Sequence, residues 1–234
     1  MPSLVLGATT SDKVDFGANT AFDTMAKFSV GILAKPTTFT DQRAYFGKRP
    51  AGAGWELDVF GTSGDLRFTM VRGTTSADYR TNTTPVVLNA WNGIIVTVDT
   101  TVSPQVVIWV WRNGALTKPT FGTQTDGAGT QPGDAAGNFL AGNIVAVTTR
   151  ALQGNVEHLM LWPGVIVNGG QAADWFTAPR SLEGACRYWD LGADGLGPQR
   201  DRQHGDTSGT VTGATIAESV PRTLVVPRVR RQWA

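Results

Sequence analysis

The sequence predicts an all-β protein, and three observations support this prediction. First, 28 Gly and 12 Pro among 234 residues, together with many Thr and Val, favour numerous short strands and turns over helices. Second, apolar residues recur at every second position in several segments, most clearly from Phe28 to Ala34, and this is the period of a strand. Third, Asn113-Gly114 is a dipeptide that favours the tight turn of a β-hairpin.

The stretch from Asn89 to Gly114 contains two apolar runs of strand length, Gly93–Asp99 and Gln105–Trp111. The first run has aliphatic residues on one face and ends in polar residues on the other, as expected of a half-buried strand. The second run is apolar on both faces, with aliphatic residues on one and Trp109 and Trp111 on the other. Such a strand is buried between two layers or carries a binding face.

The same alternation, bounded by turn residues, predicts further strands along the chain. They are Leu4–Gly7, Lys13–Phe16, Phe28–Ala34, Ala44–Lys48, Trp55–Phe60, Leu66–Met70, Asn138–Val147 and Asn155–Trp162. Thr74–Pro85 and Thr117–Gly137 lack a strong apolar pattern and are predicted to be loops, the second of them mobile or ordered by a partner. A short helix is expected over Gln171–Phe176, with Asn168 as its N-terminal cap.

Composition and charge exclude several classes of protein. The 20 basic and 19 acidic residues nearly cancel, so the chain as a whole attracts neither nucleic acid nor an anionic membrane. Cys186 is the only cysteine, which rules out an intrachain disulfide framework and a zinc site built from cysteines. No apolar run approaches ~18 residues, so we expect no membrane span. Residues 1–16 lack the features of a signal peptide, so we expect synthesis in the cytoplasm.

Several stretches resemble one family of β-sandwiches. Trp91 precedes the first run of the central stretch, and the second run ends in an aromatic residue, a spacer and Asn113-Gly114. The segments KVDFGANTAFDTMAKFSVGILAKP and GNVEHLMLWPGVIVNGGQAADWF are similar to the opening and closing parts of the same family. These features resemble concanavalin A-like, laminin-G-like domains. The resemblance implies a jelly-roll sandwich of two antiparallel sheets, formed by residues 1–218.

The C-terminal block, residues 185–217, resembles the part that normally opens such domains. It contains Tyr-Trp-x-Leu, a polar spacer, Asp-Thr-Ser-Gly and Gly-Thr-Val-Thr-Gly-Ala, in that order. In this chain the segment comes last, as in a circular permutation, which is physically easy because jelly-roll termini lie near each other. We therefore expect residues 185–217 to complete the sandwich.

The glucanases of this fold indicate where an active site would lie. The resemblance implies that a glucanase active site has the pattern Glu-x-Asp-x-(x)-Glu on one strand. Retaining hydrolysis needs these residues, because it uses a carboxylate nucleophile and a second carboxyl group about 5 Å away. Glu56 and Asp58 share one face of a predicted strand, but Phe60, or Gly61 in the longer spacing, replaces the second Glu. We therefore expect no catalytic residues, with Glu56 and Asp58 facing solvent on a half-exposed strand.

Other reactive residues are few. His158 lies in an apolar strand and is expected to be a hydrogen-bonded core residue, whereas His204 lies in a polar loop. No Gly-x-Ser-x-Gly elbow accompanies them, and Cys186 is expected to be a small buried hydrophobe. We expect the protein to bind no metal or cofactor. Calcium binding is an alternative, because lectin-type jelly rolls often use calcium. Its candidate ligands are Asp194, Asp201 and Asp206.

A carbohydrate site would require an exposed aromatic ring beside polar groups, because the apolar face of a sugar stacks on such rings. Trp109 and Trp111 are the candidate carbohydrate-binding residues, and Trp55 and Trp91 are further alternatives. Most of the eight Trp are nevertheless expected in the core or at an interface.

The last residues, 219–234, read SVPRTLVVPRVRRQWA and are predicted to form an extended arm. Pro221 and Pro227 disfavour both a helix and a central strand. Such an arm gains stability by lying on another subunit, with its apolar residues buried and its arginines paired with carboxylates. The candidate partner-binding residues are Leu224, Val225, Val226, Arg228, Arg230, Arg231 and Trp233. Nucleic acid is not an expected partner, because no aromatic residues are interleaved with these arginines.

Together these observations predict a non-enzymatic structural protein of a virion, made in the host cytoplasm. Laminin-G-like domains with such a C-terminal block resemble those of tailed-phage structural proteins, and the arm suits attachment to a neighbouring subunit. We favour a capsid decoration or cement protein that binds the major capsid protein or other virion proteins and forms homo-oligomers. The alternative is a carbohydrate-binding, lectin-like module, including a tail or fibre adhesion component that binds a surface glycan.

Overall fold

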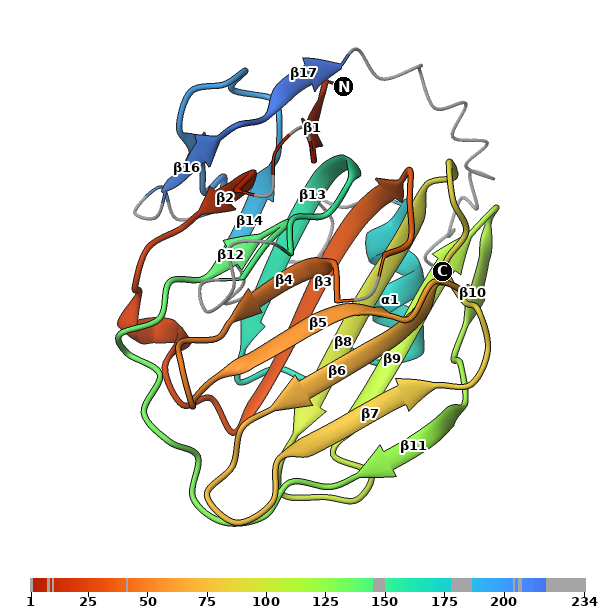
Figure 1. Cartoon of the computed structure of the whole chain (residues 1–234), viewed down its shortest axis with the longest axis vertical. Coiled ribbons are helices and arrows are strands. Elements are labelled where there is room, and N and C mark those ends of the chain that lie inside the picture. Colours follow the sequence, from red (N-terminus) through yellow and green to blue (C-terminus); the bar gives the residue numbers. More distant parts are fainter. Residues whose placement is uncertain are drawn as a thin grey trace, which may run out of the picture.

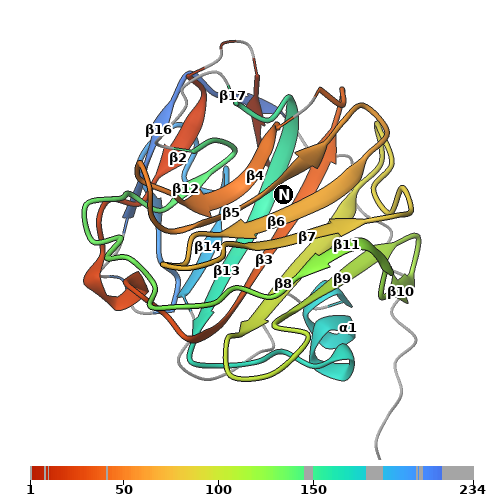
Figure 2. The same cartoon turned by 60° about the horizontal axis from the view of Figure 1, so that its bottom comes forward.

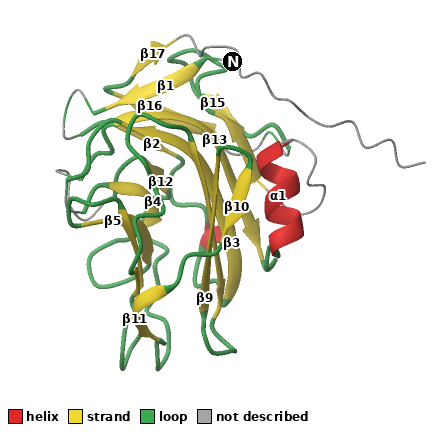
Figure 3. Ribbon diagram, turned by 90° about the vertical axis from the view of Figure 1, so that its right-hand side faces the viewer, coloured by secondary structure: helices red, strands yellow, loops and turns green. Residues whose placement is uncertain are grey.

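The computed structural model describes residues 2–7, 9, 11–40, 42–144, 150–177, 187–203, 205 and 208–217, which form a two-layered β-sandwich (Figure 1). Two antiparallel sheets face each other, and the one α-helix of the described residues lies outside one of them (Figure 3). The predicted all-β sandwich is therefore confirmed. No helix in this part of the chain is long and apolar enough to cross a membrane.

The eight-stranded sheet contains both runs of the central stretch as neighbouring strands. Its order is β10 (Ala115–Thr117), β9 (Val106–Arg112), β8 (Asn92–Asp99), β3 (Lys27–Pro36), β13 (Gly154–Pro163), β1 (Ser3–Leu6) and β17 (Thr215–Ala217). An eighth strand, β14 (Arg187–Asp190), pairs with β13 beyond the part of β13 that pairs with β1. β1 and β14 therefore share one edge of β13.

The nine-stranded sheet lies over the first sheet (Figure 2). Its order is β11 (Phe121–Thr125), β7 (Ala77–Thr81), β6 (Asp65–Met70), β5 (Trp55–Phe60), β4 (Ala44–Lys48), β12 (Leu140–Ala141), β2 (Lys13–Asp15), β16 (Ser208–Thr212) and β15 (Gln199–Arg200). A short 3-10 helix, η1 (Thr20–Phe22), follows β2. Consecutive strands β4 to β7 are neighbours, so this half of the sheet is a simple meander.

The main core lies between the sheets and is built largely from aromatic rings. The centroids of Trp55 on β5 and Phe28 on β3 lie 4.8 Å apart, so the two layers meet ring against ring. Phe139 contacts Trp55 at 5.8 Å and Trp189 on β14 at 6.0 Å. All four rings are buried, and burying each one removes a large apolar area from water.

A second, smaller core lies between the outer face of the eight-stranded sheet and α1 (Gly169–Thr177) (Figure 3). Trp175 and Phe176 of the helix are buried there with Ile95 and Met160 of the sheet. A Cβ at Gly93 would lie 2.3 Å from the Phe176 ring. Glycine at this point of β8 therefore allows the helix to lie close to the sheet.

The predicted cap of this helix is confirmed, and it is reciprocal. The backbone N–H of Gln171 donates to Asn168 Oδ1, and the backbone N–H of Asn168 donates to Gln171 Oε1, each at 3.0 Å. These two bonds satisfy N–H groups that a helix start leaves without partners in the helix itself.

The described part of the C-terminal block contributes strands to both sheets. β14 pairs with β13, β16 pairs with β2, and β17 pairs with β1. β16 and β17 thus lie beside the N-terminal strands and extend the two sheets at that side of the sandwich (Figure 1). Residues 218–234 lie outside the described residues, so the arm and its candidate partner-binding residues stay a prediction.

The two predicted loops were wrong in part. β7 lies within Thr74–Pro85, and β11 lies within Thr117–Gly137. β7 directs Tyr79 inward but has only one other apolar residue, so its alternation is weak. Of the strand predicted at Asn138–Val147, β12 forms only Leu140–Ala141 among residues up to 144, and residues 145–149 are not described.

Buried hydrogen bonds hold the segment that follows β11. Asp126 Oδ1 accepts from the backbone N–H of Gln105 at 3.0 Å and from the Tyr79 hydroxyl. The Gln105 side chain bonds both the N–H and the carbonyl of Gly127, at 2.8 and 2.9 Å. These polar residues stabilise the segment through bonds that apolar periodicity does not report.

Candidate functional site

The two carboxylates of β5 lie on the outer face of the nine-stranded sheet. Trp55, Leu57 and Val59 belong to the main core, so Glu56 and Asp58 point the opposite way. Both residues are nevertheless completely buried, at 0% exposure. The prediction that these carboxylates face solvent is therefore wrong, because segments distant in the sequence cover this face.

Glu56 is surrounded by donors from three segments. Its Oε1 accepts hydrogen bonds from Arg49, from Thr69 Oγ1 at 3.3 Å and from Arg150 Nη1 at 3.4 Å. Arg49 also donates to Thr69 Oγ1 at 2.7 Å, which ties the three side chains together. Two positive charges therefore compensate one buried carboxylate.

A glycine explains how Glu56 becomes covered. Gly47 on β4 is its cross-strand partner, and a Cβ at Gly47 would lie 3.0 Å from Glu56 Cβ. The same atom would lie 3.1 Å from Ile144 Cγ2. The missing side chain therefore lets Ile144 lie close to the sheet beside the carboxylate.

Asp58 forms a bidentate ion pair with Arg67 on the neighbouring strand. Arg67 Nε donates to Oδ1 at 3.1 Å and Nη2 to Oδ2 at 2.5 Å, the paired geometry that guanidinium and carboxylate groups share. Burial raises the pKa of Asp58 to about 7 in spite of this cation, and the carboxylate of Glu56 adds a smaller upward effect. Asp58 is therefore a proton-binding group near neutral pH.

Phe60 occupies the position of the second Glu in the glucanase pattern. Arg80 Cζ lies 4.4 Å and Arg67 Cζ 5.6 Å from the centroid of its ring, so two guanidinium groups interact with one aromatic ring. Arg80 also pairs with Asp78 at 2.5 Å. These groups form what we call the arginine–carboxylate network: Glu56, Asp58, Phe60, Asp78, Arg49, Arg67, Arg80 and Arg150.

Trp109 and Trp111 lie under α1, in the second core. The Trp111 ring stacks on Phe176 with centroids 6.0 Å apart, and Trp109 Nε1 is buried. Lys118 Nζ lies 5.9 Å from the Trp109 ring. Both rings are partly buried against the second core, and their role as candidate carbohydrate-binding residues stays a prediction. Trp55 is fully buried in the main core and offers no exposed ring.

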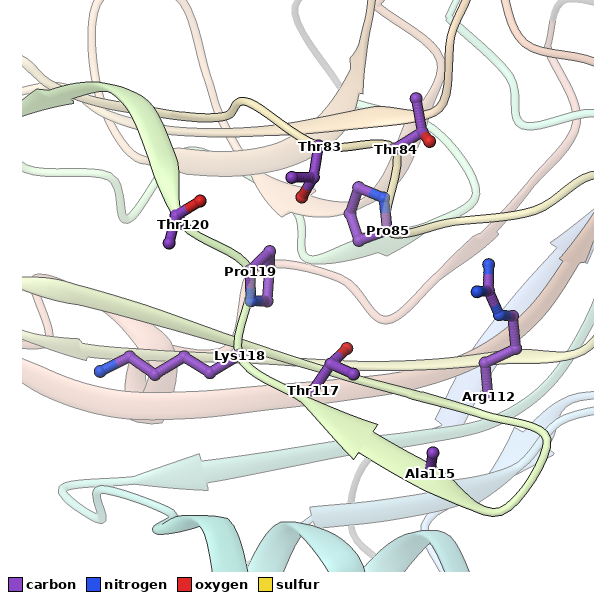
Figure 4. Close-up of a pocket in the computed structure, with 9 residues that line it drawn as sticks. All are labelled: Thr83, Thr84, Pro85, Arg112, Ala115, Thr117, Lys118, Pro119 and Thr120. Atoms are coloured by element: carbon purple, nitrogen blue, oxygen red, sulfur yellow. The ribbon is translucent and has the colours of Figure 1, made fainter.

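A pocket of about 390 Å³ opens where β9 and β10 meet the connection that follows β7 (Figure 4). We call it the threonine pocket, and its lining residues are Thr83, Thr84, Pro85, Arg112, Ala115, Thr117, Lys118, Pro119 and Thr120. On β10, Ala115 is the partner of Arg112 and Thr117 the partner of Val110. The side chains that line the pocket from β10, Ala115 and Thr117, are both small. Sequence reasoning did not find this pocket.

The sequence of this chain also matches the model of a known protein family. The laminin G model of the concanavalin A-like lectin/glucanases superfamily matches residues 8–168, more than half of the chain. The chain belongs to the concanavalin A-like lectin/glucanase superfamily. No curated protein sequence is similar enough to count as a match.

Three solved structures illustrate the fold of this concanavalin A-like protein. A native heptameric SAP-like pentraxin from Limulus polyphemus has a TM-score of 0.60 at 11% identity, covering 93% of this chain and 95% of that one. Tailspike protein 2 of an Escherichia coli O157:H7 bacteriophage has a TM-score of 0.51 at 10% identity, covering 76% and 24%. The extracellular region of zebrafish Gpr126/Adgrg6 has a TM-score of 0.52 at 14% identity, covering 92% and 26%. At these identities the likeness concerns the fold alone.

The remaining candidates in this concanavalin A-like protein are held by neighbouring side chains. His158 is a hydrogen-bonded core residue, as predicted, with its Nδ1 2.8 Å from the Tyr188 hydroxyl. The candidate calcium ligands pair with arginines: Asp194 with Arg202 at 2.8 Å and Asp201 with Arg187 at 3.0 Å. Within the described ranges, no three His, Cys, Asp or Glu residues are grouped to hold a metal. Cys186, His204 and Asp206 lie outside those ranges.

Proposed function

We propose that this protein is a non-enzymatic structural component of a phage particle. In this proposal it is a capsid decoration or cement protein that binds the major capsid protein or other virion proteins and other copies of itself. The observation that carries the non-enzymatic part of the proposal is the arginine–carboxylate network. A glycosidase needs two accessible carboxyl groups, whereas Glu56 and Asp58 are buried, each is bound by arginine, and Phe60 stands where a third carboxyl group would be.

Two further observations support a place on a phage particle. A bacteriophage tailspike contains a domain of the same fold, so phages use this sandwich in their particles. The composition of residues 219–234, apolar residues followed by arginines, suits an arm that lies on another subunit.

Imaging of the native particle tests this proposal. Purified particles would be analysed by mass spectrometry for this chain, and cryo-electron microscopy would locate it. We expect many copies on the outer surface of the capsid shell. Absence of the chain from purified particles would overturn the virion role, and a position on a tail or fibre would overturn the decoration role.

A second candidate is a carbohydrate-binding, lectin-like module, which the threonine pocket favours. Its wall offers hydroxyl groups and one guanidinium group, which are the kinds of group that bind polar ligands. In this role the protein would attach a particle to a surface glycan. Binding of soluble sugars to the isolated chain tests this candidate without any particle.

A further inference from the structure

The threonine pocket has a positive group that no carboxylate neutralises within the described residues. Arg112 is half-buried at the end of β9, and no described carboxylate lies within 4.0 Å of its guanidinium group. It differs in this from Arg67 and Arg80, each of which pairs with an aspartate. Figure 4 shows its side chain rising from β9 toward Pro85. The pocket therefore presents a guanidinium group that is available to a ligand.

Lys118 does not add a second charge at the same place. Figure 4 shows its side chain extending away from the other lining residues. Its Nζ lies 5.9 Å from the ring of Trp109, in the layer that faces α1. The positive charge of the pocket is therefore concentrated at Arg112.

The hydroxyl groups of the pocket fall into two kinds. The side chains of Thr83 and Thr84 are exposed and make no hydrogen bond with described residues, so each can donate and accept. Thr117 Oγ1 donates to the Val110 carbonyl at 3.1 Å and therefore offers a ligand its lone pairs. The pocket thus combines donors and acceptors at short range, with Pro119 as an apolar part of its wall.

We propose that the threonine pocket binds a sugar residue that carries a carboxylate. The planar guanidinium group of Arg112 matches a carboxylate with two parallel hydrogen bonds. Thr83 and Thr84 have the donors and acceptors that sugar hydroxyls require, and Pro85 and Pro119 offer apolar contact to ring C–H groups. A volume of about 390 Å³ suits one or two sugar residues. This inference rests on the carbohydrate-binding candidate and is independent of the virion role.

Titration calorimetry of the full chain tests the inference with three probes: glucuronate, glucose and acetate. We expect glucuronate to bind and the other two probes to bind at least about tenfold more weakly. Glucose lacks the carboxylate for Arg112, and acetate lacks the sugar hydroxyl groups for the threonines. Equal binding of acetate would overturn the inference in favour of a plain anion site. Equal binding of glucose would overturn the acidic preference while the lectin-like candidate stands. If none of the three binds, the inference is wrong, and binding of other soluble sugars then tests the lectin-like candidate separately.

Variants assign the binding to the pocket. Arg112→Gln is expected to weaken glucuronate binding about tenfold or more, the loss typical of a charged hydrogen-bonding partner. Ala115→Phe, on exposed β10, fills the pocket without removing any charge and is expected to abolish binding. Arg200→Gln is the matched control, because Arg200 is exposed on β15, a strand that contributes nothing to the pocket. Unchanged affinity in both pocket variants, with thermal unfolding like that of the parent chain, would refute the assignment.

Discussion

The ring of Trp189, in the C-terminal block, lies 4.5 Å from the ring of Phe16, which directly follows β2. Trp189 is fully buried, and Phe16 is 4% exposed. This contact joins an N-terminal segment to the C-terminal block inside the main core. The C-terminal block is therefore part of the packed interior, and its removal should affect folding.

Truncation after Gly184 is expected to give insoluble protein or a large loss of melting temperature. The deletion removes Trp189 from the core and leaves β1, β2 and β13 each with an unpaired edge. Trp189→Ala alone should lower the free energy of unfolding by about 3–5 kcal/mol, as is typical of large buried rings. Thermal and denaturant unfolding measure both effects. A truncated chain that stays soluble and melts like the full chain would contradict the predicted role of residues 185–217.

The pKa of Asp58 predicts a specific pH dependence of stability. Its pKa rises from 3.8 to about 7 on folding, so between these values the folded chain holds a proton that the unfolded chain releases. The contribution of Asp58 is therefore full below about pH 4 and is lost as the pH rises to about 7. In Asp58→Asn, which cannot titrate, this decline should be absent. Urea unfolding in steps of ~0.5 pH unit between pH 4 and 7 gives the free energy of unfolding as a function of pH. The slope of this plot is compared between the parent chain and Asp58→Asn.

Asp99→Asn is the matched control for this experiment. Hydrogen bonds from Thr101 and Lys27 lower the pKa of Asp99 to about 2, so its contribution is present above 3.8 and is lost as the pH falls through about 2. Its replacement should leave the slope between pH 4 and 7 unchanged. An Asp58→Asn variant with the parent slope would show that burial does not perturb this carboxyl group.

No hydrolysis of β-glucans is expected from the purified protein. Glu56 and Asp58 are buried and paired, and Phe60 supplies no proton to a leaving oxygen. Release of reducing sugars from a panel of β-glucans measures this. Hydrolysis that disappears in Glu56→Gln would overturn the prediction, and Arg200→Gln would control for a contaminating enzyme.

Deletion of residues 219–234 is expected to weaken attachment to the particle while barely changing thermal stability. The two prolines of this segment disfavour regular structure, so its apolar residues and arginines gain most by contact with another subunit. Attachment is measured as binding of the shortened chain to particles stripped of the protein. Thermal stability is measured as the melting temperature of the isolated shortened chain. If the chain without residues 219–234 binds stripped particles as tightly as the full chain does, the prediction is wrong.

Strands with a clear two-residue period were predictable from the sequence. β3, β5, β6, β8 and β9 direct apolar residues to the main core at every second position, and the structure contains all of them. β13 was also predicted, although a register shift between Val156 and Leu159 interrupts its period. Two of the strands that were missed, β7 and β11, lie at one side of the nine-stranded sheet, where fewer apolar residues are needed. β11 even shows no buried residue, so no apolar period was present to detect.

The candidate site was less predictable, because it depends on segments that only the fold brings together. Arg67 alternates with Leu66 and Phe68, so its outward direction was readable from the sequence. The positions of Arg49 and Arg150 beside Glu56 were not readable, because neither lies within a regular strand. The same limit applies to Trp111, whose ring stacks on Phe176 of a helix that follows much later in the chain.

The pairing of β1 with β17 also constrains how the protein is made. Ser3 pairs with Ala217, so the first described strand finds this partner only after the last described strand has left the ribosome. During synthesis the meander from β4 to β7 can form from local contacts, whereas the edge at β1 and β2 stays open. Aggregation during translation should therefore begin at that edge, and slower elongation would lengthen the period of exposure.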